Sequence, residues 1–313
     1  MSTSTTSAAR SAASTRSRAW PVTDRGQTAT RLLASSAKKS YDPAVDVDWA
    51  AEVPDDLYGL SPEWSSLYGT SLWDRMTHQQ RVTLTKHEVA SISGAGIWFE
   101  MILMQMLVRD MYGRDATEPH FQFALTEIAD ECRHSVMFAR GAAAFGCPSY
   151  RPQRLVLELG RGFAATATGA VAYGGTLFVE ELLDVMQRDF MKDERVQPIS
   201  RTISKIHVLE EARHIRFARE EIVRRVQDIT PLQRARVRAV LAATALTVVE
   251  SLVHPDVYAA AGLDVREARR AVRNNQHYHA QLRHGASRTL SFLDDVGLVG
   301  GPSRVLLQRA HLV

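Results

Sequence analysis

Two copies of a five-residue motif contain side chains that can bind metal ions. The motif reads acid-Glu-x-Arg-His and occupies residues 130–134 and, eighty positions later, residues 210–214. In a helix, a glutamate and a histidine three positions apart project from the same face and can bind one ion together. One such pair is typical of many exposed polar helix faces, but two copies on separate long helices favour a metal site. The pairs are Glu131 with His134 and Glu211 with His214.

A helical site for two metal ions needs one further carboxylate from each of two other helices, because bridging carboxylates hold the cations together. Glu100 lies in residues 97–108, where ten of the twelve residues are apolar. An unpaired buried carboxylate costs several kcal/mol, so Glu100 requires either a cation or a buried arginine as its partner. The sequence is compatible with both partners.

The remaining carboxylate is one of two neighbours, Glu180 and Glu181. At helical spacing Glu181 shares a stripe with Asp184 and Arg188, which indicates a solvated, ion-paired face. Glu180 instead shares its face with a mainly apolar set: Tyr173, Leu177, Leu183 and Gln187. The helical phase therefore predicts Glu180 as the metal ligand.

A third histidine narrows the chemistry. His207 lies four residues before Glu211 and seven before His214, which places all three on one helix face. An isolated histidine at such a position is commonly a packed core residue. Because this face also carries the proposed metal ligands, the pattern favours a third imidazole ligand.

These seven residues together resemble the metal-binding motifs of the AurF-like non-haem di-iron N-oxygenases, bacterial enzymes that oxidise an aryl amine through hydroxylamine and nitroso levels to nitro. The resemblance covers about residues 70 to 225 and implies a ferritin-like four-helix bundle core with additional flanking helices, two Fe ions with O2 as co-substrate, and a homodimer. It also implies that Glu131 and Glu180 bridge the metals. The other ligands would be Glu100, His134, His207, Glu211 and His214.

The acids that precede the ligand glutamates have a role of their own. Asp130 and Glu210 each lie four residues before the histidine of their motif. Metal-bound imidazoles usually donate their free N–H to a carboxylate, so these two acids are expected to orient the histidines, within or across the motifs. Arg133 and Arg213 would balance their charge, and outward-facing salt bridges are the alternative.

Three functions are compatible with this site. The first is an O2-dependent monooxygenase that oxidises an amine, and the second is a di-iron hydroxylase or desaturase acting at carbon. Iron storage or sensing on a ferritin-like bundle is the non-enzymatic alternative, and the long segments outside the ligand helices favour pocket walls instead. A substrate with a carboxylate would need an arginine or tyrosine, for which Arg109, Arg283 and Tyr278 are candidates.

The elements that must position these residues are all helices. Helical patterns extend over about residues 77–112, 119–145, 152–192, 197–228, 231–253 and 265–285, and no strand-like alternation is sustained. The fold class is therefore all-α. Residues 1–40 are too polar to bury area and are expected to form a disordered tail, residues 41–70 to lie extended over a core, and residues 41–313 to form one domain.

Composition excludes several classes of protein. Hydrophobic residues make up 45% and charged residues 23% of 313 residues, which is typical of a folded globular chain. The net charge of +3 comes from scattered arginines, so nucleic acid is not expected as a partner. Residues 162–179 are rich in Gly, Ala and Thr and make a poor membrane span. Two cysteines form no disulfide framework and fit the cytoplasm. Neither a dinucleotide fingerprint nor an Fe–S motif occurs, so electrons must come from an external donor.

Overall fold

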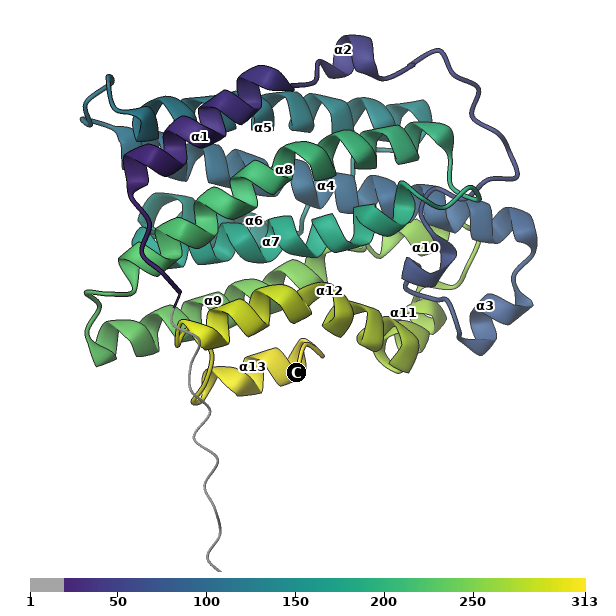
Figure 1. Ribbon diagram of the computed structural model, residues 1–313. Coiled ribbons are helices and arrows are strands. Elements are labelled where there is room, and N and C mark those ends of the chain that lie inside the picture. The colour runs from purple at the N-terminus through teal and green to yellow at the C-terminus, as the bar shows by residue number, and fades with distance from the viewer. Residues whose placement is uncertain (1–19) are drawn as a thin grey trace, which may run out of the picture.

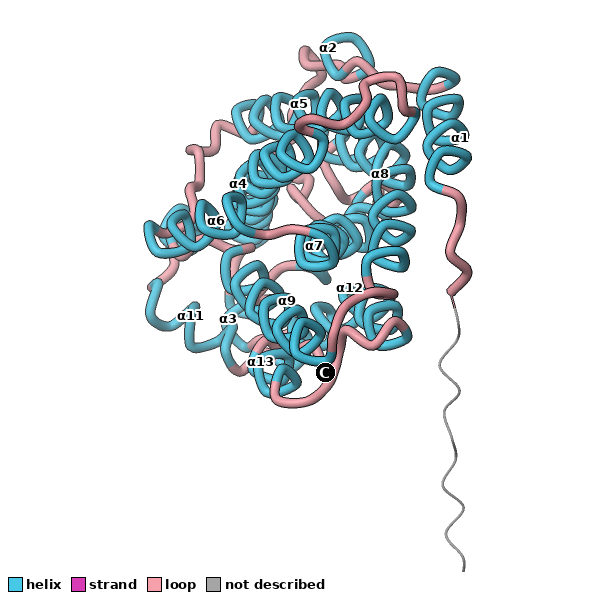
Figure 2. Tube along the Cα trace, turned by 90° about the vertical axis from the view of Figure 1, so that its left-hand side faces the viewer, coloured by secondary structure: helices cyan, strands magenta, loops and turns pink. Residues whose placement is uncertain are grey.

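The computed structural model describes residues 20–313, and these residues form an all-α fold around a four-helix bundle (Figures 1 and 2). The bundle helices are α4 (His78–Met111), α5 (Pro119–Ala144), α7 (Gly169–Phe190) and α8 (Pro198–Arg225). The most extensive helix contacts join α4 to α5 and α7 to α8. The bundle thus consists of two antiparallel helix pairs, as the predicted ferritin-like fold requires.

The ends of α4 and α5 follow from local chemistry, and both helices were predicted within two residues. Thr77 and Gln80 form a capping box that satisfies the first free N–H groups of α4. Gly113 and Gly146 follow α4 and α5 with φ of 81° and 66°, a conformation that side chains with a Cβ disfavour.

The predicted helix over residues 152–192 is wrong, because the chain breaks within it. The observed helices are α6 (Arg154–Thr166) and α7, separated by Ala167 and Thr168. Gly169 has a φ of 55° at this break, and the Arg109 guanidinium donates to the carbonyls of Ala164 and Ala167. These hydrogen bonds satisfy carbonyl groups at the end of α6 that have no partner within the helix.

The prediction of a disordered tail is wrong for residues 25–38, which form α1 (Arg25–Lys38); residues 1–19 lie outside the described part of the chain. Asp24 caps α1, and Arg25 forms an ion pair of 2.9 Å with the buried Glu221 of α8. Small and apolar side chains of α1, among them Ala29 and Leu32, pack against α5 and α8. This tertiary packing compensates for a polar composition.

The segment between α1 and α3 (Ser71–Arg75) has little regular secondary structure. It contains only α2 (Pro43–Asp46) and the short 3-10 helix η1 (Pro62–Trp64), and turns and bends make up much of the rest, so the prediction of an extended segment is only partly right. Its own side chains Leu60, Trp64 and Leu67 are fully or almost fully buried. The segment therefore lies against the core as a peripheral strap.

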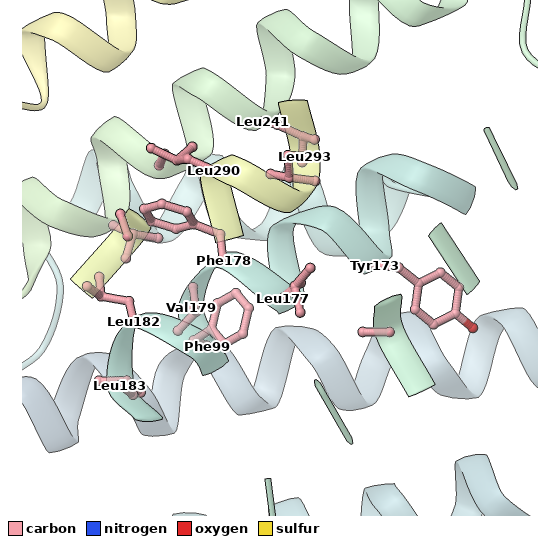
Figure 3. Packing of buried hydrophobic residues seen from close by; sticks show 14 of the residues in the cluster. Phe99, Tyr173, Leu177, Phe178, Val179, Leu182, Leu183, Leu241, Leu290 and Leu293 are labelled. Carbon is pink, nitrogen blue, oxygen red and sulfur yellow. The ribbon is translucent and has the colours of Figure 1, made fainter. Parts of the chain in front are cut away.

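C-terminal helices pack around the bundle. They are α9 (Pro231–Ser251), α10 (Asp256–Ala260), α11 (Val265–Arg273), α12 (Gln276–Asp295) and α13 (Ser303–Arg309). Helices α9 and α12 pack on α7, α10 packs on α4, and α13 packs on α9. Leu177 and Phe178 of α7 pack with Leu241 of α9 and with Leu290 and Leu293 of α12 (Figure 3). The single helix predicted over 265–285 divides into α11 and α12, because Asn275 caps a new helix.

Two stretches, α4 and residues 231–260, are apolar and long enough to cross a membrane by length and composition alone. Half of the apolar window of α4 is buried inside the fold, and core helices meet the same criterion. This pattern is weak evidence for a membrane protein.

Close packing of α6 on α4 gives a testable expectation. A Cβ on Gly160 would lie 2.2 Å from Trp98 of α4, whereas a Cβ on Gly162 of the same helix would meet nothing within 4 Å. Gly160→Ala should therefore destabilise the protein by about 1–3 kcal/mol. Gly162→Ala should stabilise it by about 0.5–1 kcal/mol. Urea unfolding measures both, and equal stability of the two variants would contradict this packing.

A buried carboxyl outside the metal-binding residues predicts a pH effect. Glu88 of α4 accepts hydrogen bonds from the Ser66 N–H at 2.9 Å and hydroxyl at 2.6 Å, and burial raises the pKa of its carboxyl to about 7. Because the folded protein binds this proton more tightly than the unfolded chain, Glu88 contributes stability that is fully present below the unfolded pKa of 4.5. This contribution to the free energy of unfolding is lost as pH rises through the folded pKa of about 7. Glu88→Gln stays neutral, so its free energy of unfolding relative to wild type should rise by about 3 kcal/mol from pH 4.5 to 8. Parallel pH curves in urea unfolding would show that Glu88 does not titrate in this way.

Candidate metal centre

The four bundle helices bring all seven predicted residues into one buried cluster. None of these side chains is more than 2% exposed. Three of the groups able to hold a metal ion contain only predicted residues, with donor atoms within 4.8 Å of one another. These groups are Glu100, His134 and His207; Glu131, His134 and Glu211; and Glu180, His207 and Glu211.

The two motif histidines direct the same nitrogen toward the same carboxylates. His134 Nδ1 lies 3.0 Å from Glu131 and 3.3 Å from Glu211. His214 Nδ1 lies 3.0 Å from Glu211 and 3.1 Å from Glu131. Nδ1 of each ring and the two glutamates therefore face a common centre, where metal ions would replace the direct contacts.

The opposite nitrogens confirm the expected role of the preceding acids. His134 Nε2 lies 2.9 Å from Glu210, and His214 Nε2 lies 3.3 Å from Asp130, so each acid serves the histidine of the other motif. Both acids are fully buried, which excludes the outward-facing alternative. This arrangement fixes ring orientation and leaves Nδ1 free for a metal.

Arginines balance these two acids, as predicted. Arg133 pairs with Asp130, and Arg213 lies 3.3 Å from Asp130 and 3.5 Å from Glu210. Burial alone would raise the pKa of both carboxyls, but the hydrogen bonds and charges of His214 and His134 hold the pKa of each below its usual value. The backbone N–H of Tyr41 also donates to Glu210 at 3.0 Å, so the strap after α1 supports the site.

Glu100 and Glu180 lack the partners that buried carboxylates normally have. Glu100 accepts a hydrogen bond from Ser135 on one oxygen, but its Oε1 has no partner, and no arginine lies within ion-pair distance among residues 20–313. Both oxygens of Glu180 are without a partner. Burial raises the pKa of both carboxyls. The predicted alternative of a buried arginine beside Glu100 is therefore wrong, and both carboxyls are available to bind cations.

The predicted solvated face around Glu181 is wrong. Glu181 is 4% exposed and contacts Arg219 at 2.5 Å and the Thr289 hydroxyl at 2.5 Å, and Asp184 is likewise buried and paired with Arg188. The outer helix α12 covers this side of α7, which the pattern of α7 alone did not reveal. Glu181 therefore has its charge compensated, whereas Glu180 does not.

His207 is fully buried, and neither ring nitrogen has a hydrogen-bond partner. Its Nε2 lies 3.8 Å from Glu211 and 3.9 Å from Glu100, too far for hydrogen bonds but on the side of the carboxylates. A packed core histidine normally has at least one partner, so this imidazole is available to a metal ion.

Sequence reasoning missed one residue of the cluster. Glu127 of α5 is 1% exposed, and its donor atom lies within 4.8 Å of those of Glu131 and His214. Its spacing before Glu131 equals the spacing of His207 before Glu211. That repetition was the signal that could have identified it.

The donor set suits iron. Carboxylate oxygens and imidazole nitrogens from four helices meet in the buried interior, and several of the oxygens have no protein partner. Such sets bind first-row divalent metals, and iron is held this way in helical di-iron proteins. The residues present therefore fit two iron ions.

Comparison with known proteins agrees with this geometry. The family described as P-aminobenzoate N-oxygenase AurF matches residues 22–297. The chain belongs to the AurF family. Over 213 residues it is 27% identical to the uncharacterized proteins Mb0909 of Mycobacterium bovis and Rv0885 of Mycobacterium tuberculosis. The match covers 65% of this chain and 62% of each relative, which is less than two thirds of the relatives' length.

Neighbouring glutamates of α7 should behave in opposite ways. Glu181→Gln removes the buried partner of Arg219 and should cost about 1–3 kcal/mol of stability while metal content is retained. Glu180→Gln removes an uncompensated carboxylate, so the metal-free protein should keep its stability while metal is lost. Plasma emission and urea unfolding measure the two properties. Metal loss in Glu181→Gln alone would transfer the ligand role to Glu181.

Proposed function

We propose that this AurF-family protein is a di-iron, O2-dependent N-oxygenase that oxidises an aryl amine to the hydroxylamine, nitroso or nitro level. The observation that carries the proposal is the cluster of unpartnered carboxylates and imidazoles at the centre of the bundle. The iron ligands are Glu100, Glu131, His134, Glu180, His207, Glu211 and His214.

Glu131 and Glu180 are the proposed bridging carboxylates, as the family resemblance implies. Glu131 belongs to two of the donor groups, which is consistent with a carboxylate shared by two metals. Glu211, His134 and His207 also belong to two groups each, so group membership alone does not identify a bridge.

Bound iron would supply the activation of O2 and the oxidising power, which protein side chains lack. The protein contributes orientation and a dry site. The carboxylates of Asp130 and Glu210 hold the two imidazole rings with Nδ1 inward, and their position outside the ligand cluster keeps them from competing for the metals. Buried aromatic and aliphatic side chains exclude bulk water from the reacting groups.

The proposed amine site is a cavity that Phe138 separates from His207. Its lining includes Phe138, whose ring centroid lies 4.9 Å from that of His207. The cavity holds about 30 Å³, room for a few water molecules, so side chains must move when an aromatic ring enters. The lining is mostly apolar, and Gln187 Oε1 and Ser200 Oγ are buried without partners. These oxygens can accept hydrogen bonds from an amine.

The same lining favours a substrate without a carboxylate. It contains no arginine, lysine or histidine, so a benzoate group would be buried without a counter-charge. The arginines and tyrosine proposed from the sequence lie elsewhere: Arg109 caps α6, Arg283 contacts the His311 carbonyl, and Tyr278 lines a separate cavity. The proposed substrate is therefore an uncharged aryl amine rather than p-aminobenzoate.

Electrons come from an external donor, and the protein acts as a homodimer in the cytoplasm. Family membership supports the need for a donor, and the dimer is what the family resemblance implies. Cys132 and Cys147 are both free, as in most proteins of a reducing compartment.

Substrate choice tests this proposal. Reduced, iron-loaded protein is exposed to O2 with p-aminobenzoate or with its uncharged methyl analogue, p-toluidine. We expect oxidation at nitrogen and a kcat/KM at least about tenfold higher for p-toluidine, because the cavity offers no partner for a carboxylate. Mass spectrometry identifies the products. Products hydroxylated only at carbon would support the alternative di-iron hydroxylase, and a preference for p-aminobenzoate would exclude this cavity as the amine site.

Variants of His207 distinguish an effect on iron binding from an effect on amine oxidation. His207→Ala leaves both Glu-x-x-His pairs intact, so about half or more of the iron should remain while amine oxidation per iron falls at least about tenfold. His207→Gln keeps side-chain volume and distinguishes lost packing from a lost ligand. Unchanged oxidation per iron in His207→Gln would return His207 to a packing role.

A further inference from the structure

Glu127 has no role in the site proposed so far, yet it lies inside the cluster. Its side chain is 1% exposed, and its Oε2 is buried without a hydrogen-bond partner. Its donor atom forms a metal-binding group with those of Glu131 and His214. Burial of a carboxyl oxygen without a partner is unfavourable, and a bound cation would offset that cost.

The two halves of the bundle are equivalent around this cluster. α4 with α5 and α7 with α8 form the two helix pairs, and each pair contributes one lone glutamate and one acid-Glu-x-Arg-His motif. The exchanged contacts from Asp130 to His214 and from Glu210 to His134 follow the same two-fold relation. Each ligand in one half therefore has a counterpart in the other half.

Glu127 is the counterpart of His207 in this relation. α8 carries His207, Glu211 and His214 at spacings of four and three, and α5 carries Glu127, Glu131 and His134 at the same spacings. His207 groups with His134 of the opposite helix pair, and Glu127 groups with His214 of the opposite helix pair. The equivalence covers both the spacing and the partner.

We propose that Glu127 is an eighth protein ligand. It binds the metal ion nearer His214, as its counterpart His207 binds the metal ion nearer His134. This inference rests on the proposed di-iron function and extends it. One metal ion gains an oxygen ligand where the other gains a nitrogen ligand, so the two ions differ in donor set. The pair of ions therefore has two different affinities.

Anaerobic titration of metal-free protein with Fe(II) against a chelator tests this assignment. Wild type should bind two ions, and Glu127→Gln should lose at least tenfold in affinity for one ion while the other changes less than threefold. Glu127→His recreates the spacing and residue types of α8, and should recover most of the lost affinity. Glu88→Gln is the matched control, because Glu88 is equally buried on α4 and its carboxylate contacts Ser66 outside the cluster.

A spectroscopic measurement guards against a purely structural effect. With Co(II) in place of iron, Glu127→Gln should shift the visible d–d bands of one ion and leave those of the other unchanged, whereas Glu88→Gln should match wild type. Two ions bound to Glu127→Gln with wild-type affinities and spectra would overturn the role of Glu127 and leave the di-iron proposal intact. Failure of wild type to bind two ions would instead overturn the proposed function.

Discussion

Burial of negative charge at the centre of the bundle is the constraint on which the rest of the structure depends. Five carboxylates from four helices, those of Glu100, Glu127, Glu131, Glu180 and Glu211, meet in the interior with three imidazoles. Desolvation raises the pKa of Glu100, Glu127 and Glu180, and several oxygens of the five carboxylates have no partner within the described residues. Bound cations would satisfy these oxygens together.

The buried cluster also determines how the motif helices lie against each other. The contacts of His134 with Glu210 and of His214 with Asp130 join α5 to α8, and they fix the relative position of the two motifs along the helix axes. The remaining elements supply stability that the centre does not. Arg219 of α8 compensates the charge of Glu181, and Arg25 of α1 compensates that of Glu221, so these charges next to the centre are neutral as pairs. The hydroxyl of Thr289 on α12 adds a hydrogen bond to Glu181. Among the described residues, every buried carboxylate oxygen without a partner belongs to this cluster except one oxygen of Glu88.

The sequence predicted those parts of the fold that local chemistry determines. The capping box at Thr77 and the glycine after α4 are local signals, and the repeated motif identified both ligand helices. Features that depend on contacts between distant segments were missed. The polar α1 forms because Arg25 meets Glu221, and the face of α7 around Glu181 is buried because α12 lies over it. Glu127 was missed for another reason, since its spacing was visible but its buried position was not.

We propose that these buried carboxylates hold two metal ions. A crystal structure of the iron-loaded protein, with anomalous data collected on both sides of the iron absorption edge, tests it most directly. We expect two iron peaks between α4, α5, α7 and α8, within bonding distance of Glu131, Glu211 and the Nδ1 atoms of His134 and His214. An interior without iron, or iron bound only at the surface, would contradict it.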